Sequence, residues 1–145
     1  MEKKVIPELF HLVLKVRIAF RRVMINKLKE NNIDLTFEML QIIHALWLEQ
    51  GQSQQALAAI TVRDKASLTS LVTNLEKKGL IERQVAGSDG RSRLVYLSPA
   101  GEELSEMLKP MVQEVYDHLE EKVGRTATLW ASAYLTDIFE ELEKI

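Results

Sequence analysis

One segment of this chain, residues 63–98, constrains the fold more than any other. Its first half, RDKASLTSLVTNLEKKGLIERQ, repeats leucine and valine at helical spacing, and the helical pattern ends at Gly79. Its second half contains two strand-like runs, 80–85 and 92–97, joined by AGSDGR, in which Asp-Gly is a strong turn signal. The segment therefore predicts an amphipathic helix over 64–78 that is followed at once by a β-hairpin.

Apolar spacing predicts five further helices, over 5–30, 36–50, 53–60, 99–123 and 128–144. Thr36, Ser53, Asp64 and Ser98 stand where a side chain can cap the start of a helix, and Pro110 is expected to kink the helix that contains it. The predicted fold class is mainly α with a small β-hairpin wing, which is a winged helix-turn-helix with additional helices at both ends.

Composition excludes several classes of site. The 145-residue chain has no cysteine, which rules out disulfides and thiolate metal sites. His11, His44 and His118 lack the spacing of metal ligands, so we expect no metal and no cofactor. No apolar run approaches the ~20 residues that span a bilayer, and charged residues interrupt the N-terminus too early for a signal peptide, so we expect a cytoplasmic protein.

Catalytic signatures are missing from the sequence. It contains no GxSxG, P-loop, HExxH or CxxC motif. The carboxylate pairs Glu102–Glu103 and Glu120–Glu121 fall on helix faces that we predict to be exposed and have no fitting partner. We therefore expect that the protein is not an enzyme.

Charge is unevenly distributed along the chain. Residues 61–99 carry seven basic and four acidic side chains, whereas residues 100–145 carry four basic and eleven acidic ones. Positive charge around the helix and hairpin favours a polyanionic partner. The acidic end is equally compatible with an ordinary solvated helix face.

The helix over 64–78 has the side chains of a DNA recognition helix. Lys65, Ser67, Thr69 and Ser70 lie on its outward face and can reach phosphates or base edges, and Ala66 can contact a thymine methyl group. The same polar face is also compatible with a helix that is merely exposed to solvent.

The hairpin supports the DNA interpretation. Arg91 and Arg93 flank its turn, where arginine suits the narrow minor groove and its negative potential. We assign Asp89 to orienting Arg91 through an ion pair. The alternative is a surface hairpin with ordinary salt bridges.

Taken together, Leu35-Thr36, the SQQALA helix start, RDKASLTSLVTNLEKKGLI, the Asp89-x-Arg91 wing and LVYLSPAGEEL resemble the MarR (multiple antibiotic resistance regulator) family of bacterial transcription factors. The resemblance covers about residues 35–104. It implies a winged-helix homodimer that binds pseudo-palindromic operators, usually as a repressor released by a small ligand or by oxidation. Without cysteine, release by thiol oxidation is excluded.

The resemblance also implies roles for individual residues. It assigns DNA contacts to Ser53, Gln54, Lys65, Ala66, Ser67, Thr69, Ser70, Asn74, Arg91 and Arg93, with Asp89 orienting the wing. It places a small-molecule effector near Phe10, His11, Arg17, Phe20, His44 and Trp47. Met39, Ala56 and Ser70 depart from the residues that are frequent in the family: the first two remove capping partners, and Ser70 shortens the reach toward bases.

The resemblance further divides the chain into an N-terminal dimerisation helix (1–32), a DNA-binding lobe (33–98) and C-terminal dimerisation helices (99–145), intertwined as one domain. We expect double-stranded DNA and a second copy of the chain as partners, and no membrane. The competing hypothesis is a winged helix that binds proteins without sequence-specific DNA binding, but the positive charge of residues 61–99 argues against it.

Overall fold

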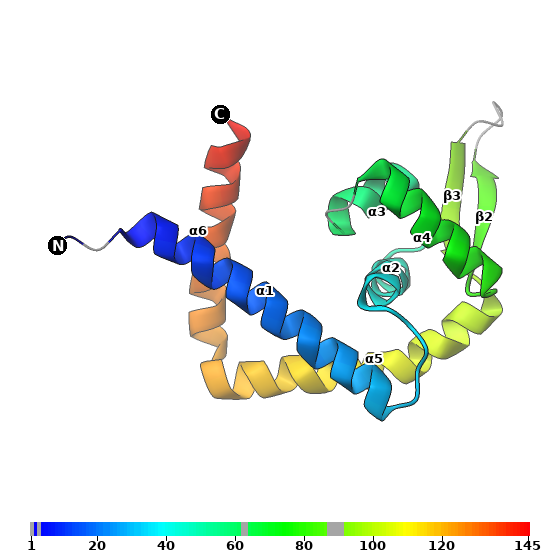
Figure 1. Ribbon diagram of the computed structural model, residues 1–145, viewed down its shortest axis with the longest axis horizontal. Coiled ribbons are helices and arrows are strands. Elements are labelled where there is room, and N and C mark those ends of the chain that lie inside the picture. Colours follow the sequence, from blue (N-terminus) through cyan, green and yellow to red (C-terminus); the bar gives the residue numbers. More distant parts are fainter. Residues whose placement is uncertain (1, 3, 62–63, 87–91) are drawn as a thin grey trace. The chain divides into compact units, whose positions relative to one another are not determined.

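The computed structural model describes residues 2, 4–61, 64–86 and 92–145 (Figure 1). The elements follow in the order α1 (Val5–Glu30), α2 (Phe37–Leu48), β1 (Gln52–Ser53), α3 (Gln54–Thr61), α4 (Lys65–Lys77), β2 (Ile81–Ala86), β3 (Ser92–Leu97), α5 (Pro99–Val123) and α6 (Arg125–Glu143). They form two compact units, residues 1–107 and 108–145. The mainly α fold with a small sheet confirms the predicted fold class.

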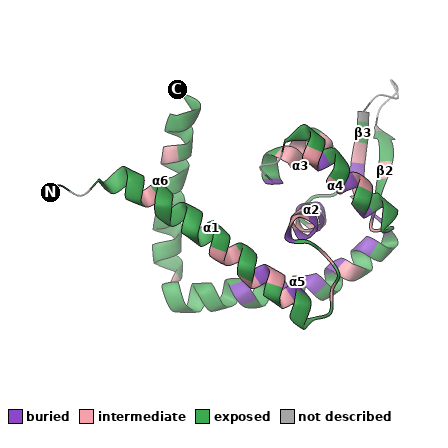
Figure 2. Ribbon diagram, viewed as in Figure 1, coloured by how far each residue is buried: buried purple, intermediate pink, exposed green. Residues whose placement is uncertain are grey.

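The core of the first unit is built around α2. Seven of the twelve residues of α2 are buried, and Figure 2 shows this helix largely in purple. Ile42, Ile43 and Leu46 are inaccessible to solvent. Burial on several sides of one helix is expected for a central element that other helices and a sheet surround.

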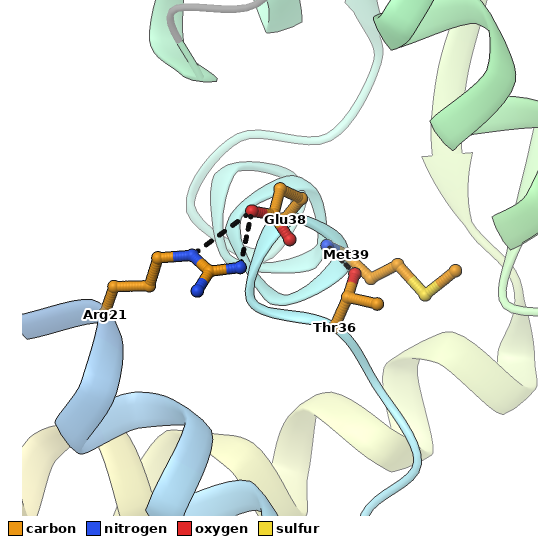
Figure 3. A network of polar contacts seen from close by, with 4 residues as sticks. All are labelled: Arg21, Thr36, Glu38 and Met39. Atoms are coloured by element: carbon orange, nitrogen blue, oxygen red, sulfur yellow. Dashed lines mark hydrogen bonds and ion pairs between the residues drawn. The ribbon is translucent and has the colours of Figure 1, made fainter. Parts of the chain in front are cut away.

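The start of α2 is fixed by two polar contacts (Figure 3). As predicted, Thr36 caps the helix, and its hydroxyl oxygen accepts a hydrogen bond from the Met39 backbone nitrogen at 3.1 Å. The Arg21 guanidinium donates to the Glu38 carboxylate at 3.2 Å, which ties α1 to the first turn of α2. The Phe20 and Phe37 rings pack edge to face beside this contact, with their centroids 6.1 Å apart.

The sheet has three strands in the order β1-β3-β2, all antiparallel. The hairpin of β2 and β3 was predicted, but the two-residue strand β1 was not. In β1, Gln52 pairs with Val95. The buried Gln52 amide donates to the carbonyls of Ala45 and Glu49 at 2.9 Å, which anchors β1 to the end of α2. The hairpin is thereby joined to the helical core along one edge instead of standing alone.

Most helix ends follow the predicted caps. Ser53 and Ser98 accept hydrogen bonds from Ala56 and Gly101 at the starts of α3 and α5. Gly79, at φ +74°, ends α4. Several boundaries differ by one to three residues. Among them, α2 ends at Leu48, and α3 extends one residue to Thr61. α6 begins three residues before the predicted start, because the chain resumes a helix directly after Gly124 at φ +96°. α5 is assigned as one helix through Pro110, and the kink there stays a prediction.

The second unit contains the end of α5 and all of α6. α6 has no buried residue, although it carries several large apolar side chains. Figure 2 shows it green along nearly its whole length. Its exposed large apolar residues are Leu129, Trp130, Tyr134, Leu135, Phe139 and Leu142.

Candidate DNA interface

α3 and α4 form the helix pair of a helix-turn-helix. They pack against each other and against α2, with Leu57 of α3 and Leu68, Val72 and Leu75 of α4 fully buried. The i, i+4, i+7 spacing of these α4 residues places them on one face of the helix. The opposite face of α4 is thereby held toward solvent by a rigid apolar contact, which a recognition helix requires.

The N-terminus of α4 is capped by Asp64. The carboxylate of Asp64 accepts hydrogen bonds from the Ser67 backbone nitrogen and the Ser67 hydroxyl, both at 2.8 Å. The backbone bond first, and then the hydroxyl bond, lower the pKa of Asp64 below its usual value of 3.8. The first turn of α4 is therefore fixed by an ionised side chain.

We expect the Asp64 cap to make stability depend on acidic pH. Because the folded-state pKa is lowered, the stabilisation is present above the unfolded pKa of about 3.8 and is lost as pH falls through the lower folded pKa. Asp64→Asn retains an acceptor for Ser67 but does not titrate. Urea unfolding midpoints measured between pH 7 and pH 2.5 should therefore fall less steeply in Asp64→Asn than in the parent, and equal slopes would remove this role for the carboxylate.

The solvent-facing surface of α4 contains most of the predicted base-reading residues. Ser67 is half-buried and hydrogen-bonded to the cap. The side chains of the others are exposed: Lys65, Ala66, Thr69, Ser70 and Asn74. Apart from Lys65 these are small or short side chains, so the helix backbone can approach the floor of a groove closely.

The two residues predicted to contact phosphate before the turn, Ser53 and Gln54, are both half-buried. The Ser53 hydroxyl caps α3 by accepting from Ala56 at 3.1 Å. The Gln54 amide donates to the Thr69 hydroxyl at 3.3 Å and accepts from Arg83 at 3.1 Å. Both side chains therefore already take part in contacts within the lobe.

Arg83 is a residue of this site that the sequence reasoning missed. Its guanidinium reaches α3 through Gln54 and reaches α4 through Thr73, whose hydroxyl accepts from Nη2 at 3.1 Å. Its Nε lies 3.3 Å from a carboxylate oxygen of Glu76 but lacks hydrogen-bond geometry. The alternation of β2 was the available signal, since Arg83 shares a face with the buried Ile81.

The wing is described only in part. Arg93 is exposed on β3 and pairs in register with Val85 of β2. Asp89 and Arg91 lie outside the described residues, so their predicted ion pair and minor-groove contact stay predictions.

The six predicted effector residues lie on α1 and α2, and their joint role in one site stays a prediction. Phe10, His11 and Arg17 are exposed on the N-terminal part of α1. Phe10 and Phe20 are ten residues apart on one helix, which is about 15 Å along its axis. A pocket of about 310 Å³ lies instead at the ends of α1 and α4 and the start of α5, where Ile33, Lys78 and Leu104 line it, and it contains none of the six.

His44 and Trp47 form a close pair among these candidates. Their rings meet edge to face with centroids 4.7 Å apart, and both side chains are half-buried on α2. Burial lowers the pKa of His44, which favours the neutral imidazole.

Metal sites and membrane-spanning helices are both absent from the part of the chain that the structure describes. Over residues 2, 4–61, 64–86 and 92–145, no cluster of histidine and carboxylate side chains has the arrangement of a metal site. No helix in the same ranges has both the length and the apolar character needed to cross a membrane.

The fold and the site together define a winged helix-turn-helix protein of the DNA-binding class. A family model described as "MarR family" matches residues 33–92. The chain is 35% identical over 115 residues to the transcriptional regulator FarR of Neisseria gonorrhoeae, a match that covers 79% of this chain and 76% of FarR. The chain belongs to the MarR family of transcriptional regulators, and it is not an enzyme.

Solved structures agree with this assignment. The chain is similar to the structure of MepR of S. aureus in its DNA-binding conformation, with a TM-score of 0.80 and 25% sequence identity. The alignment covers 91% of this chain and 96% of MepR. It is also similar to the structure of NadR in complex with 4-hydroxyphenylacetate, with a TM-score of 0.71 and 31% sequence identity. The alignment covers 99% of this chain and 95% of NadR.

Proposed function

We propose that this transcriptional regulator is a homodimeric repressor that binds a pseudo-palindromic operator and is released by a small-molecule ligand. In this proposal residues 33–98 bind DNA, and residues 1–32 and 99–145 form the dimer. The observation that carries it is the exposed face of α4, which combines small and polar side chains with a buried apolar face behind them. That combination lets a helix enter the major groove while its backbone stays rigid.

The proposed dimer is supported by the apolar side chains that a single chain leaves uncovered. Large apolar residues are exposed along α6 and along the N-terminal half of α1, among them Trp130, Phe139 and Phe10. Apolar surface of this extent in one chain favours association. A two-fold axis through such an interface presents two copies of α4, which suits half-sites about one helical turn of DNA apart, ~34–36 Å.

A small aromatic acid is the class of ligand that we propose. NadR, to which the chain is 31% identical, was solved with 4-hydroxyphenylacetate. Here the half-buried His44–Trp47 pair offers an aromatic surface and an imidazole for such a molecule. In this proposal, a second copy contributes the exposed candidates on α1 to the site.

The DNA-binding part of the proposal is tested with random-sequence duplex DNA over a salt series. A dimer that contacts 6–10 phosphates should lose about 10³–10⁵-fold in affinity between 50 and 200 mM salt. Arg91→Ala is expected to weaken binding to all sequences, because the assigned contact is with the DNA backbone region and minor groove. No binding at about 50 mM salt would favour the protein-binding alternative instead.

Ligand release is tested separately by adding 4-hydroxyphenylacetate to the protein–DNA complex. The expected result is dissociation of the complex and a higher melting temperature of the free protein. A Trp47→Ala variant that keeps DNA binding but loses the ligand response would support the assigned site.

A further inference from the structure

We propose that Arg83 helps to determine what α4 offers to a base. Through Gln54 it fixes which lone pair of the exposed Thr69 hydroxyl remains free to accept a hydrogen bond. The proposal deepens the DNA-binding function and rests on it. It assigns Arg83 and Gln54 as positioning residues and Thr69 as the residue that reads an exocyclic amino group.

The chain of contacts begins at Arg83 on the inward face of β2. Only 18% of its side chain is exposed, and the Glu76 carboxylate lies 3.3 Å from its Nε. Its Nη1 donates to the Gln54 Oε1 atom, and its Nη2 donates to the Thr73 hydroxyl, each at 3.1 Å. The guanidinium is therefore held between α3 and α4 by partners on both helices.

Arg83 decides which way the Gln54 amide faces. The oxygen and nitrogen of an amide are assigned from the hydrogen-bond network around them. A guanidinium has donors only, so the amide oxygen must face Arg83. The amide nitrogen then faces Thr69, and the two atoms Gln54 Nε2 and Thr69 Oγ1 are 3.3 Å apart.

The bonds from Gln54 and to the Lys65 carbonyl together decide what the Thr69 hydroxyl can do. A threonine hydroxyl has one proton and two lone pairs. One lone pair accepts from Gln54, and the proton is donated to the Lys65 backbone carbonyl at 2.9 Å. The exposed Thr69 side chain therefore retains one acceptor lone pair and its methyl group, and it has no proton to give to a base.

An acceptor on α4 selects among base edges. In the major groove, the amino groups of adenine (N6) and cytosine (N4) are donors, whereas guanine and thymine present the acceptors O6 and O4 on their own edges. We therefore expect adenine or cytosine on the strand that faces Thr69. A single neutral hydrogen bond of this kind corresponds to about three- to tenfold in affinity.

The test starts with selection from a randomised duplex library by the full-length protein and by Thr69→Val. Valine keeps the shape of threonine and its methyl group but removes the acceptor. The base position whose preference differs between the two selections is the one that Thr69 reads. The expected preference of the parent there is adenine or cytosine, and a preference for guanine or thymine overturns the proposal.

A second step removes the amino group itself. The selected adenine or cytosine is replaced by its analogue without the exocyclic amino group. The parent should lose about three- to tenfold in affinity, and Thr69→Val should lose nothing further, as expected when the variant and the base change remove one shared contact. Equal losses in both proteins overturn the proposal. Thr128→Val is the matched control, because Thr128 makes the same bond to the carbonyl four residues before it but lies on α6.

The role of Arg83 is tested by comparing Arg83→Met with Arg83→Lys. Lysine is also a donor-only side chain, so it should retain the amino-group preference, whereas methionine should lose it with little change in the salt dependence of binding. If Arg83→Met retains the preference for a base with an exocyclic amino group, the proposed link from Arg83 through Gln54 to Thr69 is wrong. Should that variant not fold, Gln54→Leu removes the same link.

The outcomes separate this proposal from the function on which it rests. If the parent shows no salt-dependent binding to duplex DNA, the proposed function fails. If the parent binds DNA with the expected salt dependence but Thr69→Val keeps every base preference, only the proposed base reading by Thr69 is wrong, and the proposed DNA-binding function stands.

Discussion

Leu135→Glu is expected to convert the protein to a monomer at micromolar concentration and to reduce operator affinity by about 10²–10⁴-fold. The loss in affinity follows because each monomer then binds one half-site, without the high effective concentration that a linked second site provides. This is the largest effect that we expect from a single substitution.

The physical reason is the apolar face of α6. Large apolar residues of α6 spread over about half of the helix circumference at 3.6 residues per turn, with Ile138, Leu142 and Leu135 nearest its middle and Trp130 and Phe139 at its two edges. Trp130 is 59% exposed and Leu135 is 44% exposed in the single chain. A carboxylate at position 135 within a protein interface would have to be buried without a partner, and such burial is strongly unfavourable.

Ala133→Glu is the matched control. Two residues along a helix correspond to a rotation of about 200°, so position 133 lies on nearly the opposite side from Leu135. The same charge there should leave the dimer and its DNA affinity unchanged. Sedimentation of the parent and of both variants measures their oligomeric state. A parent that is already monomeric would contradict the proposed homodimer.

Gly101→Ala is expected to destabilise the first unit by about 1–2 kcal/mol. Gly101 is buried in the first turn of α5, where a Cβ atom would lie 2.0 Å from the Leu80 carbonyl oxygen. The same oxygen accepts a hydrogen bond from the Ser98 backbone at 3.0 Å, so the backbone of Leu80 cannot move without disturbing the cap of α5. Overpacking costs about 1–3 kcal/mol.

The sign of the change in unfolding free energy for Gly101→Ala distinguishes overpacking from helix propensity. Helix propensity alone predicts the opposite, a gain of up to about 1 kcal/mol, because alanine is the better helix former. Urea unfolding at pH 7 measures the change in free energy. Glu103→Ala, which is exposed on the same turn, should be close to neutral, and a stabilised Gly101→Ala would show that α5 does not pack on Leu80 as described.

The local elements of this fold were predictable because their signals are local. Thr36, Ser53, Asp64 and Ser98 cap helices where the sequence places them, since a capping side chain bonds a backbone nitrogen two or three residues ahead. Gly79 and Gly124 lie at positive φ, which glycine adopts without steric cost. Neither kind of signal requires knowledge of distant residues.

The features that the sequence reasoning did not find depend on residues that are distant in sequence. β1 is two residues long, and it exists because Gln52 and Ser53 pair with a strand more than forty residues later. The Gln54 amide lies between Arg83 and Thr69, an arrangement that the sequence did not indicate, and its predicted phosphate contact stays a prediction. Contacts between residues so far apart in sequence are created by packing and leave no local pattern.

The sequence by itself determined the class of protein. Helical periodicity, four capping residues and a basic hairpin after an amphipathic helix were enough to predict a winged helix-turn-helix, because each of these features depends on spacing within one element. The MarR family was predicted from the resemblance of its motifs between residues 35 and 104. The tertiary structure alone decided how that lobe is held together. Only the packing of α3, α4 and β2 brings Gln54, Thr69 and Arg83 within hydrogen-bonding distance, and the directions of those bonds follow from which atoms meet.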